Sequence, residues 1–267
     1  MNTFDFAGKT VLLTGASMGI GEAFARELSR RGATLILVAR SEAKLEALAT
    51  ELGNAHVIPQ DLTTAGAAKR VFDAVTAKGL DVDVLINNAG FGINAAFDDI
   101  PLTTQREQID LNVGALMELT YLFLPTIERR QGGVIQVASM ASFMPCPYMA
   151  VYGATKAFVL SFGEALWAEY RPRGVRVLTL CPGATDTPFF ERAGAVGGAD
   201  KRARPEDVVE VGLAAFLAGR ATVIQGTANY VASLSPRFLP REFTAKTMAR
   251  IAKPKEPARL RAARRGA

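Results

Sequence analysis

Short apolar runs alternate with longer amphipathic stretches along this chain, and this alternation limits its fold more than any other feature. Runs typical of buried strands occur at 10–15, 34–39, 56–61, 82–88, 133–139, 174–183 and 221–226. Helix-forming stretches occur between them at 20–32, 41–53, 64–78, 103–130, 148–170 and 205–218. This order predicts an α/β fold: a single doubly wound domain whose seven-stranded parallel sheet has helices on both faces.

The positive charge of the chain is concentrated at its C-terminus. The net charge is +5, and residues 253–267 hold six basic residues against one acidic residue, so residues 1–252 sum to zero. We expect residues 1–252 to form one domain and 253–267 a solvated basic tail. Weak attraction of the tail to acidic membranes or nucleic acid is the alternative. The balanced charge of the remainder predicts no nucleic-acid partner.

The sequence favours a cytoplasmic protein. It has no run of about eighteen uncharged apolar residues, and its N-terminus lacks the basic and apolar regions of a signal peptide. The two cysteines match no metal-binding or redox spacing, so we expect no metal site. We assign Cys181 to the core and Cys146 to packing or a pocket.

A glycine-rich loop, "TGASMGIGEAF", directly follows the first strand and opens the first helix. Gly15, Gly19 and Gly21 would let the backbone approach a pyrophosphate, which the free N–H groups and the dipole of the helix N-terminus attract. Strand, glycines and helix come in the order that a dinucleotide site requires. A glycine-rich turn without a ligand is the alternative.

Six motifs together resemble the short-chain dehydrogenase/reductase family. They are "TGASMGIG" (14–21), "NNAG" (87–90), "LNVGA" (111–115), "VAS" (137–139), "YGATK" (152–156) and "PGATDT" (182–187). The resemblance implies a Rossmann-type catalytic domain and a nicotinamide-dependent oxidoreductase. The later segment "VIQGTANYVASLSPRFLPREF" resembles, more loosely, the end of a branch that contains hydroxysteroid-type and other carbonyl reductases.

The end of the second strand favours NADP(H) over NAD(H). Ala39 stands where an acid would hold the ribose hydroxyl of NAD, and Arg40 follows it. A guanidinium suits a 2′-phosphate, unless Arg40 pairs with Glu42 instead. The resemblance implies cofactor contacts at Gly15, Ser17, Met18, Gly19, Ile20, Gly21, Arg40, Asp61, Leu62, Asn88, Ala89, Gly90, Tyr152, Lys156, Pro182, Gly183, Thr185 and Thr187. Met18 departs from the family pattern, which often has a basic residue there.

Tyr152 and Lys156 are four residues apart on an expected helix, so they share a face. An ammonium beside the phenol should lower the tyrosine pKa toward working pH, where proton transfer is most effective. Ser139 ends the fifth strand, and its hydroxyl would bond a substrate oxygen. By resemblance, Asn112 distorts its helix and holds a water leading to the lysine. An ordinary exposed helix pair is the alternative.

These residues predict hydride transfer between NADP(H) and a carbonyl or secondary alcohol, with Tyr152 as general acid and base. A nucleotide-sensing protein that keeps the fold without turnover is the alternative from another class. We expect a substrate pocket built from Phe91, Met140, Phe143, Met144, Tyr148, Phe189 and Phe190. Such a pocket favours a hydrophobic carbonyl compound. Residues from about 188 to 204 would form its lid.

The segment 228–243, "ANYVASLSPRFLPREF", mixes aromatic residues with arginines. It would touch a membrane surface, contact another subunit or, as we prefer, cover its own domain. In the family that the motifs resemble, the long helices near 103–130 and 148–170 pair subunits. The resemblance therefore implies a homodimer or homotetramer.

Overall fold

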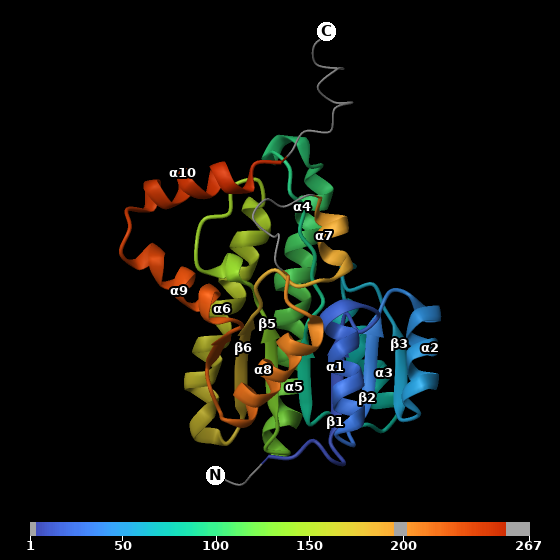
Figure 1. The fold of residues 1–267 in the computed structure, drawn as a ribbon. Coiled ribbons are helices and arrows are strands. Elements are labelled where there is room, and N and C mark those ends of the chain that lie inside the picture. The colour runs from blue at the N-terminus through green and yellow to red at the C-terminus, as the bar shows by residue number, and fades with distance from the viewer. Residues whose placement is uncertain (1–3, 195–201, 255–267) are drawn as a thin grey trace.

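The structure, a computed structural model, describes residues 4–194 and 202–254. Its centre is a seven-stranded sheet in the order β3-β2-β1-β4-β5-β6-β7, in which every neighbouring pair is parallel (Figure 1). The strands are β1 (Thr10–Thr14), β2 (Thr34–Ala39), β3 (Ala55–Pro59), β4 (Val84–Asn87), β5 (Gly133–Val137), β6 (Arg176–Cys181) and β7 (Thr222–Ile224). The predicted fold class is confirmed.

Helices cover both faces of this sheet. They are α1 (Gly19–Arg30), α2 (Glu42–Leu52), α3 (Ala67–Ala77), α4 (Leu102–Ile109), α5 (Leu116–Arg129), α6 (Ala150–Tyr170), α7 (Pro188–Ala193), α8 (Pro205–Leu217), α9 (Thr227–Leu234) and α10 (Arg241–Ala252). α1, α2 and α8 bury residues such as Phe24, Leu45 and Phe216 in one core layer. α3, α5 and α6 bury residues such as Val71 and Phe123 in the other. Because both faces are covered, the central strands are largely apolar rather than alternating. Asn87, Gln136 and Thr179 are buried polar exceptions.

The order of the strands places the loops that carry the motifs at one edge. β1 pairs with β2 on one side and with β4 on the other, so the chain crosses over in opposite directions from this point. In such sheets a ligand binds in the crevice beyond the carboxyl ends of the strands. The loops that follow β1, β4, β5 and β6 all begin at that edge.

Two regions differ from the sequence-based expectation. The stretch 103–130, expected to be one helix, is divided into α4, a π-helical turn (η2, Asp110–Ala115) and α5. Beyond β7, two further helices form an arm that stands away from the sheet (Figure 1). Within the described part of the chain, no helix combines the length and apolar character needed to cross a membrane.

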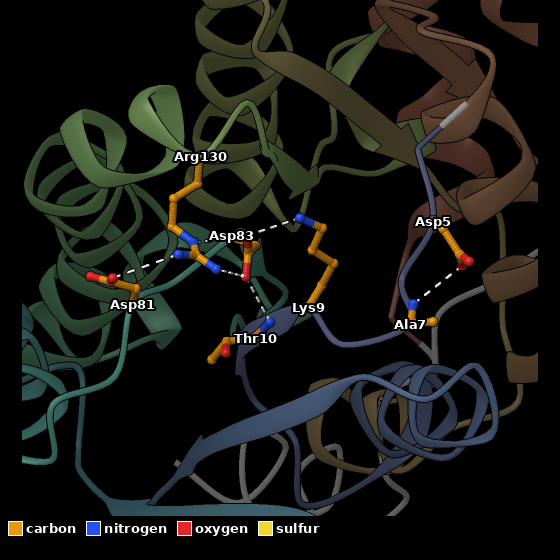
Figure 2. Close-up of polar contacts among 7 residues, drawn as sticks. All are labelled: Asp5, Ala7, Lys9, Thr10, Asp81, Asp83 and Arg130. Atoms are coloured by element: carbon orange, nitrogen blue, oxygen red, sulfur yellow. Dashed lines mark hydrogen bonds and ion pairs between the residues drawn. The ribbon is translucent and has the colours of Figure 1, made fainter. Parts of the chain in front are cut away.

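A buried carboxylate fixes the opposite, amino edge of the sheet. Asp83 is fully buried immediately before β4, and its side chain accepts hydrogen bonds from the backbone N–H of Thr10 (2.9 Å) and from Arg130 Nε (2.8 Å) (Figure 2). Lys9 Nζ lies 3.4 Å from Asp83, and Arg130 also reaches Asp81. Burial raises the pKa of Asp83, but these partners outweigh it and lower the pKa. The cluster ties the start of β1 to the start of β4.

Candidate active site

A cleft of about 770 Å³ opens at the carboxyl edge of the sheet. It brings together the loops that follow β1 to β6, which are distant in the sequence. Every residue that the sequence analysis expected at the cofactor lines this cleft except Gly21. That residue lies buried beneath the glycine loop.

The glycine loop is closed so tightly that side chains are excluded from it. Gly15 and Gly19 have φ values of +66° and +59°, a region that favours glycine. A Cβ on Gly21 would lie 2.1 Å from the carbonyl oxygen of Gly15. Met18 is the N-cap of α1 and provides no side-chain hydrogen bond, so no side chain caps the N–H groups of the first turn. They remain available to an anion.

Asn88 holds this loop against the end of β4. Its Nδ2 donates to the carbonyl oxygens of Thr14 (3.0 Å) and Gly15 (3.2 Å), and the backbone N–H groups of Asn88 and Ala89 donate to Thr14 Oγ1. A Cβ on Gly15 would lie 2.9 Å from Ala89 Cα. The side chain of Asn88 therefore fixes the position of the glycine loop relative to the end of β4.

Arg40 and Asp61 lie where β2 and β3 end, and both line the cleft. Arg40 is exposed, and among the described residues it forms no ion pair with Glu42. The alternative that Arg40 is neutralised by Glu42 is therefore wrong for this structure. Asp61 Oδ1 accepts hydrogen bonds from the backbone N–H (3.0 Å) and the hydroxyl (2.8 Å) of Thr63. These bonds fix its carboxylate at the wall of the cleft.

Tyr152 and Lys156 lie in the first two turns of α6, and both are buried. Burial raises the pKa of Tyr152 to about 12, although a hydrogen bond with Ser139 acts in the opposite direction. Burial lowers the pKa of Lys156 to about 8. Lys156 Nζ donates to the carbonyl oxygen of Val137 (2.8 Å) and lies 5.9 Å from the centre of the Tyr152 ring.

This differs from the expectation that the ammonium lowers the pKa of the phenol. Burial penalises the phenolate and the ammonium alike, and for Tyr152 it outweighs the lowering of the pKa by the Ser139 hydrogen bond. Burial thus moves the pKa of Tyr152 further from neutral pH rather than toward it. The alternative of an ordinary exposed pair is wrong, because Tyr152 and Lys156 are 9% and 4% exposed.

Asn112 is fully buried in the π-helical turn. Its Oδ1 accepts from the backbone N–H of Phe91 (3.1 Å), and its Nδ2 donates to the carbonyl oxygen of Phe91 (2.9 Å) and to Thr155 Oγ1 (3.0 Å). The helix distortion expected here is present. The side chain of Asn112 thus ties the loop after β4 to α6, one residue from Lys156.

The apolar end of the cleft is close to Tyr152. Phe189 on α7 packs with its ring centre 5.4 Å from that of Tyr152, and Phe91, Met140, Met144 and Phe190 also line the cleft. The lid expected at 188–204 is described only in part: α7 occupies its start, and residues 195–201 lie outside the described residues. Residues 255–267 of the expected tail lie outside them as well.

Two residues expected in the substrate pocket lie outside this cleft. Phe143 packs against the small core cluster that includes Val159 and Cys181, because the 3-10 turn η3 (Met140–Ser142) directs the chain inward before it. Tyr148 adopts a φ of +65° and lines a separate cavity of about 20 Å³ behind Tyr152. Met144, between them in sequence, does reach the cleft.

Other residues of the cleft were missed. The main ones are Ile93, Met149, Arg192, Met248, Ile251 and Ala252. Three of these belong to α10, whose place at the cleft leaves no spacing signal in the sequence. Cys146, assigned to packing or a pocket, lines the cleft; burial raises the pKa of its thiol to about 11, so it stays protonated.

Comparison with known proteins agrees with this geometry. The family model described as short chain dehydrogenase matches residues 9–195. A serine 3-dehydrogenase from Rhizobium radiobacter is 36% identical over 182 residues, which cover 67% of this chain and 73% of that protein.

Solved structures extend the similarity over most of the chain. A short-chain dehydrogenase from Sphingobium yanoikuyae in complex with NADPH is 30% identical, with a TM-score of 0.77 over 94% of this chain and 99% of that one. A structure from a study of 7β-hydroxysteroid dehydrogenase stereoselectivity is 27% identical, with a TM-score of 0.83 over 93% and 100% of the two chains. Fold, motif positions and relatives agree: the chain belongs to the short-chain dehydrogenase family of oxidoreductases.

Proposed function

We propose that this protein is an NADP(H)-dependent oxidoreductase that transfers a hydride between nicotinamide and the carbonyl or secondary alcohol of a hydrophobic small molecule. The observation that carries the proposal is the buried Tyr152. Its hydroxyl is bonded to Ser139, beside Lys156, in a cleft whose other end is the glycine loop.

The residues of the cleft fit a nicotinamide dinucleotide. The glycine loop presents an uncapped helix N-terminus and admits no side chain at Gly21, as a pyrophosphate cradle requires. Arg40 forms no ion pair with any of the described residues and lines the cleft where we expect a 2′-phosphate. Asp61 and Leu62 line the cleft at the expected adenine end. When bound, the dinucleotide supplies or accepts the hydride.

Each catalytic side chain then has a separate task. Tyr152, a phenol whose pKa burial raises further above neutral pH, donates its proton to the carbonyl oxygen during reduction. Ser139 donates a hydrogen bond to the same oxygen as charge develops there. Lys156 holds the nicotinamide ribose and places positive charge near the phenol, which favours the phenolate once the proton has left. Asn112 positions the loop after β4 and completes a proton relay to solvent.

The shape of the site favours an apolar substrate. Phe91, Met140, Met144, Met149 and Phe189 line the cleft near Tyr152. The 7β-hydroxysteroid dehydrogenase structure belongs to a study of an enzyme named for a bulky, largely apolar compound. Serine 3-dehydrogenase is named for a small polar one. We therefore propose a bulky alicyclic or aromatic ketone rather than an amino acid.

A panel of ketones tests this function. Purified protein is mixed with NADPH and with aliphatic, aromatic and alicyclic ketones, and the loss of NADPH absorbance and the alcohol product are measured. The proposal predicts turnover that requires the ketone and is faster for the bulky members. Tight NADPH binding without turnover of any carbonyl compound would favour the nucleotide-sensing alternative.

The cofactor preference is tested separately by titration. NADPH should bind more tightly than NADH, because Arg40 meets the 2′-phosphate. A charge-assisted hydrogen bond contributes about 1.5–3 kcal/mol. Arg40 is exposed, so we expect the lower end, a preference of roughly tenfold to thirtyfold. Arg40→Asp should reverse it, whereas Arg220→Asp, an exposed arginine outside the cleft, should not. An equal loss of affinity for NADPH and NADH in Arg40→Asp would contradict the assignment of Arg40 to the 2′-phosphate.

We further propose that residues 1–252 act as one catalytic domain and that copies pair through α4, α5 and α6. These helices expose a row of large apolar side chains, namely Leu102, Ile109, Met117, Tyr121 and Phe158. Large apolar side chains exposed on neighbouring helices are typical of interfaces between subunits. Light scattering gives the oligomeric state, and Tyr121→Glu should shift it to the monomer.

A further inference from the structure

The C-terminal arm, residues 227–254, exposes an unusual share of apolar surface. It consists of α9, the 3-10 turn η5 (Ser235–Arg237) and α10. Five large apolar side chains are exposed along it and lie outside the cleft: Tyr230, Val231, Phe238, Leu239 and Phe243. Phe238 is 83% exposed and Phe243 is 55% exposed. Large aromatic side chains left in water over so short a segment mark a surface that binds something.

The same arm is strongly basic. It holds Arg237, Arg241, Lys246, Arg250 and Lys253 against a single acidic residue, Glu242. The remainder of the chain before the arm carries a net negative charge. The apolar surface of the arm is therefore set within a field of positive charge that the body of the protein does not share.

The two properties coincide on the outer face of α10. Phe243, Lys246 and Arg250 are three and seven residues apart, so they lie on one face of the helix. Thr244 and Ala252 are buried on the opposite side. A helix with lysine, arginine and an aromatic residue outward is suited to the boundary of an anionic bilayer, where rings enter the headgroup region and cations meet lipid phosphates.

A second copy of the chain is a poorer occupant. A two-fold contact between two arms would bring together two surfaces of like charge, because each copy would contribute Arg237, Arg241, Lys246 and Arg250. The exposed apolar row on α4, α5 and α6 is interspersed with acidic residues such as Glu107 and Glu118, and it already offers a subunit interface. The arm differs from the surface of α4, α5 and α6 because its charged residues are almost all basic.

We propose that the C-terminal arm docks this enzyme on an anionic lipid surface. The inner side of α10 gives the docking a direction, because Met248, Ile251 and Ala252 line the cleft. The outer side of the same helix would rest on the lipid, and the cleft that its inner side lines would lie beside it. An apolar substrate dissolved in the bilayer would then reach Tyr152 without crossing bulk water.

Vesicle sedimentation tests the docking without nucleotide or substrate, so its outcome is independent of the proposed reaction. Full-length protein is mixed with vesicles of phosphatidylcholine alone or with phosphatidylserine added. We expect binding only to the anionic vesicles, and its loss in 1 M salt, where the Debye length is about 3 Å. Each basic residue near such a surface contributes about 1 kcal/mol, so Lys246→Gln with Arg250→Gln should weaken binding roughly thirtyfold.

Matched variants separate the arm from general charge and folding. Lys44→Gln with Lys78→Gln removes the same charge from exposed lysines of α2 and the end of α3, and it should leave binding nearly unchanged. Phe243→Ser should weaken binding, whereas Leu217→Ser on α8 should not. Melting temperatures show that each variant is folded. Absence of binding to anionic vesicles, binding that survives both arm variants, or a change of oligomeric state in Phe243→Ser would each overturn the proposal.

Discussion

Gly92 offers a sharp test of how Tyr152 is positioned. It follows β4 and lines the cleft, and its φ lies in the ordinary region, so alanine is compatible with the backbone. An added Cβ would lie 2.7 Å from Tyr152 Cδ2 and 3.0 Å from Met149 Cε. Gly92→Ala therefore changes the packing against Tyr152 and Met149 rather than the conformation of the loop.

The size of the effect follows from these distances. Ordinary carbon–carbon contacts are about 3.5–4.0 Å, so the Tyr152 ring or the loop must move by about 1 Å. Overpacking of this kind costs about 1–3 kcal/mol of stability. A displacement of about 1 Å in a catalytic group lowers the rate roughly a hundredfold. We expect kcat to fall by about that factor, and affinity for NADPH to change little because the methyl group meets no part of the glycine loop.

The assay is NADPH-dependent ketone reduction, with nucleotide affinity measured by titration. Gly114→Ala is the matched control, because the nearest heavy atom to its Cβ would be the carbonyl oxygen of Ile109 at 4.0 Å. The control should retain wild-type kcat. A Gly92→Ala variant with wild-type kcat and wild-type melting temperature would refute the claim that close packing against Gly92 positions the Tyr152 ring.

Three further predictions concern charge and backbone. Asp83→Asn should lower stability by about 3 kcal/mol, seen as a fall of roughly 5–10 °C in Tm, since it unpairs cations around a buried carboxylate; nucleotide affinity should not change. Because the folded pKa of Asp83 is lowered, its contribution is present above the unfolded value of about 3.9 and is lost as pH falls through the folded pKa, which acid unfolding of wild type and variant measures. The kcat/KM of the wild type should decline above about pH 8, where Lys156 of the free enzyme loses its proton; a flat profile there would contradict the role of its charge. Gly21→Ala should abolish nucleotide binding or folding, as calorimetry will show, because its Cβ would lie 2.1 Å from the carbonyl oxygen of Gly15.

The parts of the fold that depend on local pattern were predictable. Apolar strands buried on both faces leave a run such as "TLILVA" with no polar break, and glycine at the turn after β1 follows from the closeness of Gly15 and Gly21. The helical spacing of Tyr152 and Lys156 correctly placed both on one face of α6. Such features survive in sequence because the contacts that enforce them are local.

The parts of the fold and of the site that depend on tertiary contacts were not predictable from the sequence. Whether Phe143 or Met144 reaches the cleft is decided by a short turn after β5, and residues of the same apolar character face opposite ways. Met248 of α10 lines the cleft, and no motif near it in the sequence predicts this position. The direction of the pKa of Tyr152 also depended on burial, which raises it by more than any neighbouring group lowers it. The sequence indicates that Lys156 lies near Tyr152, but it does not show how completely the fold removes the phenol from water.

The most direct test of the account is a single turnover of NADPH-loaded protein with a bulky ketone, comparing wild type with Tyr152→Phe. Phenylalanine keeps the ring and its packing against Phe189 and removes only the hydroxyl. The account predicts unchanged NADPH affinity and a rate of NADPH consumption lower by about 10²–10⁴, the usual contribution of a general acid. A Tyr152→Phe variant that consumes NADPH as fast as wild type would contradict it.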